Sequence, residues 1–170
     1  MHEPDPLIWK RLKRYEVPGQ PRFVTFSCSQ RLPLFHRAAT KDLFLVHLDR
    51  ATAAFSVALH AFVVMPEHVH LLVTPDPAGD GIGIFLKSLK ARFARRILAD
   101  WRANRPAAVT ALATYGGDAK FWQRGGGFDR NLRREESLAD KQAYIEQNPV
   151  KRGLAKQPSG YRWSSAWHGG

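Results

Sequence analysis

Residues 63–74, with the sequence VVMPEHVHLLVT, constrain the fold more than any other stretch of the chain. The pattern predicts a strand, a tight break at Pro66-Glu67, and a second strand that pairs antiparallel with the first because the connection is short. Alternate side chains of a strand share a face, so His68 and His70 project together, about 7 Å apart at the backbone. This spacing suits chelation, although two surface histidines on a half-exposed strand would give the same pattern.

The charge balance points to a polyanionic partner. Lys and Arg total 26 against 15 Asp and Glu, a formal net charge of +11, which is most often associated with nucleic acid. A hydrophobic content of 44% indicates a folded domain and argues against a basic disordered tail. Cys28 is the only cysteine, which excludes an internal disulfide and fits a reducing compartment. With no signal-peptide pattern and no long apolar run, we expect a cytoplasmic, nucleoid-associated protein without a membrane partner.

The length suits one domain over 1–170, with a basic arm at 1–19 and a basic, aromatic tail at 150–170. Alternating and β-branched residues predict strands, and apolar residues at helical spacing predict helices. Strands are expected at 20–29, 57–65, 68–74 and 121–123, and helices at 38–55, 83–103 and from 137 to about 148. The connection at 106–120 has no clear pattern, residues 125–127 are expected to form a flexible glycine turn, and 128–132 to be extended.

This order of elements predicts an α+β fold of the ferredoxin-like (RRM-like) type, an antiparallel sheet with helices on one face. An additional C-terminal helix should begin at Ser137, where Asp140 lies at capping-box spacing, and end before Pro149. The other face of the sheet is expected to stay open and to carry the two histidines.

Two imidazoles rarely complete a metal site, so a third ligand should come from elsewhere. Tyr144 and Asn148 are four residues apart on the C-terminal helix and share a face, which places a hydroxyl nucleophile beside an amide oxygen. Gln147 is a competing ligand, and a buried Tyr144 with Asn148 capping the helix would explain the pattern without chemistry. Together with the histidines, the pair suits attack of a phenol on a phosphodiester, for which the sequence identifies no general base.

Basic side chains would supply further affinity for phosphates, although those on the long helix can equally form a solvated face. The candidates for DNA contact are Lys87, Lys90, Arg95, Arg124, Arg130, Lys151 and Arg152. Aromatic side chains could stack on unpaired bases, but most of them are expected in the core. They are Phe121, Trp122, Tyr161, Trp163 and Trp167.

In four segments the chain resembles the REP-associated tyrosine transposases, a branch of the insertion-sequence tyrosine transposases with an HUH motif (His, hydrophobic, His). The segments are MPEHVHLLV at 65–73, FWQRG at 121–125, YIEQNPVKRGL at 144–154 and YRWSS at 161–165. Two positions depart from the family pattern. Glu67 stands where the family often has Asn, and Gly126-Gly127 replaces a more aromatic or polar stretch.

The resemblance implies a ferredoxin-like core and a metal-dependent endonuclease and strand transferase for single-stranded, hairpin-forming DNA. It implies that His68 and His70 bind Mg²⁺ or Mn²⁺, that Asn148 completes the site, and that Tyr144 forms a 5′-phosphotyrosine and leaves a free 3′-OH. Mg²⁺ prefers oxygen ligands, whereas imidazole suits Mn²⁺ better, so two histidines and one amide oxygen should bind Mg²⁺ weakly until a DNA phosphate joins the site. We therefore expect metal binding and DNA binding to be coupled. The expected partner is single-stranded or hairpin DNA, and the protein should be a monomer or a homodimer.

Two other functions remain possible on the residues alone. A non-catalytic RRM-like nucleic-acid-binding module would need aromatic residues on the open sheet face, where this chain places His68 and His70. A zinc hydrolase would need a further His, Cys or carboxylate at close ligand spacing. Glu67 is adjacent to His68 but is expected to point away from it, which makes it a poor third ligand.

Overall fold

A computed structural model describes residues 17–114, 117–133 and 136–168. Its strands are β1 (Arg22–Cys28), β2 (Val57–Val64), β3 (His68–Pro75) and β4 (Trp122–Asn131). Its α-helices are α1 (Ala38–Ala54), α2 (Gly81–Asn104), α3 (Pro106–Thr114), α4 (Leu138–Glu146) and α5 (Asn148–Lys151), with 3-10 turns at Ser29–Arg31 and Pro158–Gly160. Nearly all of the predicted basic arm at 1–19 lies outside the described residues.

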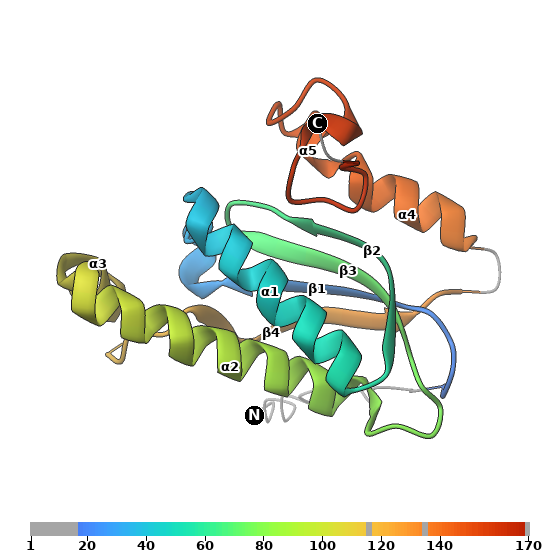
Figure 1. The fold of residues 1–170 in the computed structure, drawn as a ribbon, viewed down its shortest axis with the longest axis horizontal. Coiled ribbons are helices and arrows are strands. Elements are labelled where there is room, and N and C mark those ends of the chain that lie inside the picture. The colour runs from blue at the N-terminus through green and yellow to red at the C-terminus, as the bar shows by residue number, and fades with distance from the viewer. Residues whose placement is uncertain (1–16, 115–116, 134–135, 169–170) are drawn as a thin grey trace, which may run out of the picture.

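The strands form one antiparallel sheet with the order β2-β3-β1-β4. Helices α1 and α2 lie side by side against one face of this sheet, here called the helix face (Figure 1). This arrangement confirms the predicted ferredoxin-like α+β fold. The opposite side, which carries His68 and His70, is called the histidine face. No helix in the described ranges is long and apolar enough to cross a membrane.

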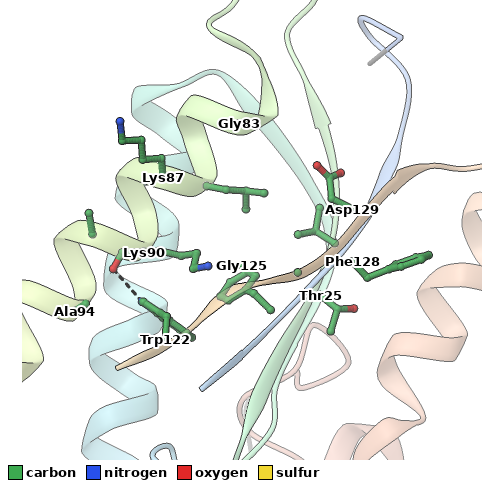
Figure 2. Close-up of a pocket in the computed structure, with 14 residues that line it drawn as sticks. Thr25, Gly83, Lys87, Lys90, Ala94, Trp122, Gly125, Phe128 and Asp129 are labelled. Carbon is green, nitrogen blue, oxygen red and sulfur yellow. Dashed lines mark hydrogen bonds between the residues drawn. The ribbon is translucent and has the colours of Figure 1, made fainter. Parts of the chain in front are cut away.

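Strand β4 corrects the predicted glycine turn, because it continues through residues 125–127. Pairing with β1 on both sides of the glycines holds the segment extended, and the register shifts between Phe26 and Cys28. Gly125 has a φ of +67°, and a Cβ on Gly127 would lie 3.1 Å from the Thr25 carbonyl oxygen. Glycine is therefore favoured at both positions, for its backbone angle at Gly125 and for the close approach to β1 at Gly127. Figure 2 shows the strand running beside β1 and α2.

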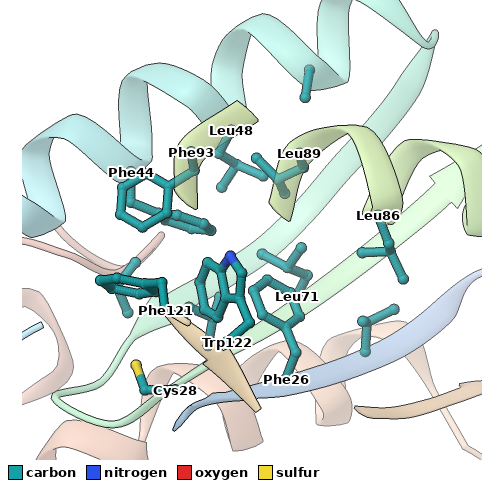
Figure 3. Close-up of a cluster of buried hydrophobic side chains, with 14 of the residues drawn as sticks. Phe26, Cys28, Phe44, Leu48, Leu71, Leu86, Leu89, Phe93, Phe121 and Trp122 are labelled. Carbon is teal, nitrogen blue, oxygen red and sulfur yellow. The ribbon is translucent and has the colours of Figure 1, made fainter. Parts of the chain in front are cut away.

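The helix face holds the main core, in which aromatic rings from distant segments pack together (Figure 3). The ring of Phe93 in α2 lies 5.2 Å from that of Phe44 in α1 and 4.9 Å from that of Phe121. The predicted apolar stripe of α2 is buried as expected from its four-residue spacing. Its members are Phe85, Leu89, Phe93, Ile97 and Trp101. This core fixes the sheet from one side.

The histidine face is partly covered, so the prediction of an open face is wrong. Helix α4 packs on it through the fully buried Ile145, in a smaller apolar cluster that includes Phe23 and Tyr161. The segment after the last 3-10 turn lies along the edge of β2, where the amide of Val64 donates to the carbonyl of Trp163 at 2.9 Å. Burying these apolar side chains against the sheet lowers the free energy relative to leaving them in water.

Candidate active site

The two histidines of β3 converge on one point of the histidine face. Their Nε2 atoms lie 3.0 Å apart, and each residue is only 7% exposed. Two nitrogens that bind one ion at about 2.1 Å and at a right angle to each other are about 3 Å apart. The predicted shared face of His68 and His70 is thus confirmed, and their spacing fits adjacent ligands of a single cation.

Hydrogen bonds at the other ring nitrogens orient both imidazoles. Nδ1 of His68 lies 3.0 Å from Oε1 of Glu67, and Nδ1 of His70 lies 2.7 Å from the Thr25 hydroxyl. An ionised carboxylate only accepts hydrogen bonds, so Nδ1 of His68 carries the proton and Nε2 presents its lone pair. Such outer partners are typical of histidines that bind metals.

Glu67 does not point away from His68, contrary to the sequence-based expectation. It lies in the turn between β2 and β3, only 8% exposed, and its Oε1 accepts a hydrogen bond from Nη1 of Arg152 at 2.7 Å. Burial raises the pKa of this carboxyl group, but Arg152 and His68 together hold it below its usual value. The carboxylate meets the Nδ1 side of His68, so it orients the ring and is not placed to share a metal at Nε2.

Both imidazoles are in the neutral form that binds metals. Burial lowers the pKa of His68, against the opposing effect of Glu67. Burial also lowers the pKa of His70 to about 3, with the neighbouring His68 acting in the same direction. Because metal ions bind the unprotonated ring, protons do not compete for these nitrogens at neutral pH.

Tyr144 projects from α4 toward this pair. Its ring centroid lies 6.2 Å from that of His70 and 5.9 Å from that of Phe23, and the residue is 42% exposed. The ammonium groups of Lys141 and Lys151 lie 5.1 Å and 5.0 Å from the centre of the same ring. A phenol that is open to solvent, flanked by two cations and next to two imidazoles can meet a phosphate group.

Helix α4 is positioned by contacts at both ends. The Ser137 hydroxyl accepts a hydrogen bond from the Asp140 amide at 2.9 Å, which confirms the predicted start of the helix. Near the other end, the Ser165 hydroxyl donates to Oε1 of Glu146 at 2.8 Å, and Ile145 is buried beneath. The C-terminal segment therefore holds Tyr144 against the histidine face.

Asn148 begins α5, one turn after Tyr144. Its side-chain nitrogen donates to the carbonyls of Tyr144 at 2.8 Å and Ile145 at 3.3 Å, so the amide caps the end of α4. That bond leaves Oδ1 as the atom that could bind a metal. Among the described residues, no hydrogen bond joins Asn148 to either histidine. The competing Gln147 is exposed at the C-cap of α4.

Tyr161, the other tyrosine in the described ranges, is less suited to attack. Tyr161 is 5% exposed and its hydroxyl donates to the Val64 carbonyl at 2.8 Å, and burial raises its pKa to about 12. Tyr15 and Tyr115 lie outside the described residues.

The predicted DNA-contact residues divide into three groups. Lys151 and Arg152 lie at the site, one beside Tyr144 and the other bound to Glu67. Lys87 and Lys90 line a groove on the helix face (Figure 2). The remaining three are Arg95 and Arg124, both exposed, and Arg130, which pairs with Glu136.

Most of the candidate stacking aromatics belong to the core, as expected. Phe121, Trp122 and Tyr161 are at most 9% exposed, and Trp163 is half-buried. Trp167, at 43% exposed, is the one of this set that is open to solvent. Phe128, which the sequence-based list omitted, is 52% exposed on β4 with its ring 5.9 Å from that of Phe23. Its position on the histidine face depends on the course of β4. The sequence did not predict that course, because residues 125–127 were expected to form a turn.

This chain matches a family of known transposases. The family described as "Transposase IS200 like" matches residues 22–148, most of the chain. The chain belongs to the IS200-like transposase family. The match spans both histidines, Tyr144 and Asn148, and it confirms the family predicted from the motifs. A search among curated proteins gave no match.

Two solved structures share the fold of this IS200-like transposase. One is a REP-associated tyrosine transposase bound to a REP hairpin, with a TM-score of 0.65 and 21% identity over 90% of this chain and 80% of the other. The second is a transposase from Deinococcus radiodurans, with a TM-score of 0.51 and 24% identity over 79% of this chain and 94% of the other. At these identities, the two matches show a shared fold.

A zinc hydrolase finds little support in this site. Within 17–114, 117–133 and 136–168, no group of three or more His, Cys, Asp or Glu side chains could hold a metal ion. The donor set on offer is a pair of imidazoles with an amide nearby. That set fits a divalent cation whose remaining positions are filled by water or by phosphate oxygens.

Proposed function

We propose that this IS200-like transposase is a metal-dependent single-stranded DNA endonuclease and strand transferase that acts on hairpin-forming DNA. The observation that carries the proposal is the position of the Tyr144 phenol beside two imidazoles whose Nε2 atoms converge at 3.0 Å. The hairpin carried by the REP-associated relative supports the choice of substrate. The +11 net charge supports a phosphate-rich partner.

His68 and His70 would hold Mg²⁺ or Mn²⁺ through Nε2, with Oδ1 of Asn148 as the proposed third protein ligand. When bound, the cation would withdraw charge from the scissile phosphate and stabilise the departing oxygen. Thr25 and Glu67 fix the two rings, so the side chains would lose little conformational entropy when they bind a metal.

Tyr144 would act as the nucleophile. Its phenolic oxygen forms a bond to phosphorus as the bond from phosphorus to the 3′-oxygen breaks, and the proton leaves the phenol while the 3′-oxygen gains one. The products are a 5′-phosphotyrosine and a free 3′-OH, and attack of a 3′-OH on the phosphotyrosine reverses the step and rejoins DNA. Lys141 and Lys151 would hold the phosphate beside the phenol.

The test is covalent trapping. A labelled DNA hairpin with single-stranded flanks is incubated with protein and Mn²⁺ or Mg²⁺, denatured, and examined for protein-linked DNA, with mass spectrometry of the adduct peptide. We expect an adduct on Tyr144 that requires metal and is absent in Tyr144→Phe, since phenylalanine keeps the ring contacts but lacks the attacking oxygen. The buried-tyrosine variant Tyr161→Phe is the matched control and should still form the adduct.

An adduct on another tyrosine would refute the assignment of the nucleophile. Hairpin binding with no adduct under any metal condition would instead favour the non-catalytic nucleic-acid-binding module.

A further inference from the structure

A groove of about 510 Å³ lies on the helix face, between strand β4 and the N-terminal half of α2 (Figure 2). We call it the α2–β4 groove. Its wall includes Phe26, Leu86 and Trp122, and Lys87 and Lys90 stand on the α2 side. Gly125 and Gly127 form part of the opposite side, which also carries the Asp129 carboxylate, paired with Arg22 at 2.7 Å. The volume falls within the range of sites that take small ligands, about 300–1,000 Å³.

The chemistry of this groove suits a nucleotide. The Lys90 ammonium lies 5.5 Å from the ring centre of Phe26 and 5.9 Å from that of Trp122, which places a cation beside an apolar wall. Lys87, one turn earlier on α2, is exposed. Proteins that bind single strands combine such features, with bases against aromatic or apolar surface and phosphates beside lysines. The net charge of +11 adds a long-range attraction for a polyanion.

The groove is connected to the candidate active site across one strand. Thr25 in β1 pairs with Phe128 in β4, and the next pair is Phe26 with Gly127. Because alternate residues face opposite sides, the Phe128 side chain lies on the histidine face, while Gly127 borders the groove. Figure 2 shows the Phe128 ring directed away from Lys90, across the strand.

Aromatic side chains lie between Tyr144 and the edge of the sheet. The ring of Phe23 lies 5.9 Å from that of Tyr144 and 5.9 Å from that of Phe128, which is 52% exposed. Beyond Phe128, β4 is the edge strand of the four-stranded sheet. The glycines at 125–127 leave that edge without side chains, so a nucleic-acid backbone can pass over it closely.

We propose that single-stranded DNA flanking the hairpin passes from Tyr144 over Phe128, crosses the edge strand at 125–127, and places a nucleotide in the α2–β4 groove. Lys87 and Lys90 bind its phosphates, and the apolar wall accepts its base. This inference rests on the proposed function, because it takes DNA at Tyr144 as its starting point. It assigns the groove to the flanking strand and not to the hairpin stem.

The test compares three DNA probes by fluorescence anisotropy in EDTA, where cleavage does not occur: the hairpin alone, with a 5′ flank, and with a 3′ flank, each flank about eight nucleotides. The double variant Lys87→Met, Lys90→Met removes both charges and keeps the apolar stems. We expect about ten-fold weaker binding of at least one flanked hairpin, since its charge-assisted contacts from both lysines to phosphates are lost. The logarithmic salt slope for that probe should fall by about 1.4, which corresponds to two single-strand phosphate contacts. The bare hairpin should change by less than about two-fold.

Two further variants separate the groove from general electrostatics. Arg95→Met removes an exposed charge of α2 that does not line the groove, and it should affect flanked and bare hairpins equally. Ala91→Trp, at an exposed position that lines the groove, should weaken flanked binding without changing the charge. Equal losses for all probes with the double lysine variant, or full flanked binding by Ala91→Trp, would overturn the proposal.

Covalent trapping of wild-type protein with the flanked hairpin and Mn²⁺ reports separately on the proposed function. If the adduct forms but the double lysine variant does not selectively weaken binding of a flanked hairpin, only the groove assignment is refuted. If the variant selectively weakens that binding but wild-type protein forms no adduct, the groove is supported and the proposed chemistry is refuted.

Discussion

The two faces of the sheet come from the same strands but bury opposite kinds of side chain. In β3, Val69, Leu71 and Val73 enter the aromatic core of the helix face, while His68 and His70 form a polar cluster on the other side. Burying neutral polar groups costs free energy unless they are hydrogen-bonded, and Nε2 of His68 faces Nε2 of His70 at 3.0 Å, where a shared proton or a bound cation would satisfy both nitrogens. The helix face therefore supplies the stability that lets the histidine face hold these groups.

The largest effect should come from damaging the helix face. Phe93→Ala removes a fully buried ring that contacts Phe44 and Phe121, and it should lower the free energy of unfolding by about 3–5 kcal/mol. Urea unfolding measures this loss. The adduct yield per folded molecule should stay the same, because the histidine face is intact. Arg95→Ala, an exposed change on the same helix, should stay within about 0.5 kcal/mol. A loss of adduct formation by folded Phe93→Ala would show that the two faces are not separable.

Much of the fold could be predicted because the apolar period differs between strands and helices. The alternation in β3 and the four-residue stripe of α2 each determine one buried face. The course of β4 could not be predicted this way. Residues 125–127 prefer turns locally, and their extended form depends on pairing with β1, about a hundred residues earlier in the chain. The segment at 163–165 lies along β2 for the same reason, through contacts that leave no periodic signal.

The candidate site was predictable where one element supplies the geometry. His68 and His70 share a strand, and Tyr144 and Asn148 share one end of a helix. The partners that orient the histidines were missed, because Arg152 and Glu67 are 85 positions apart and Thr25 reaches His70 from another strand. Only the antiparallel register of β1 and β3, which pairs Thr25 with His70, could have indicated the second contact.

A smaller effect should appear in the pH dependence of stability, where a histidine of each face can be compared. The pKa of His70 falls to about 3 on folding because of burial, the neighbouring His68 and Lys141, against the opposing Glu67. In the unfolded chain it is about 6.5. The unfolded state therefore binds more protons in this interval, and the contribution to stability is complete above pH 6.5 and decreases as the pH falls toward 3.

His70→Asn should consequently flatten the loss of stability between pH 7 and pH 5, measured by urea unfolding in EDTA. Carboxylates with ordinary or lowered pKa values remain largely ionised in that interval. The matched variant is His47→Asn in α1, whose ring lies 5.9 Å from Phe93 and whose pKa is lowered by burial and by nearby arginines. His47 is more accessible to solvent, so its variant should flatten the curve less. Equal flattening by both variants would contradict the contrast between the faces.

The smallest effect in free energy distinguishes the two described tyrosines. Tyr161→Phe leaves the Val64 carbonyl without its buried donor and should cost about 1–2 kcal/mol in urea unfolding. Tyr144→Phe changes a half-exposed hydroxyl and should stay within about 0.5 kcal/mol. The adduct assay should give the opposite ranking, with Tyr161→Phe active and Tyr144→Phe inactive. If both variants lost stability and activity together, the C-terminal segment and α4 would act as one unit, and stability could not be assigned to one tyrosine and chemistry to the other. The Ser165–Glu146 hydrogen bond is the contact that would couple them, and Ser165→Ala would then reproduce the shared loss.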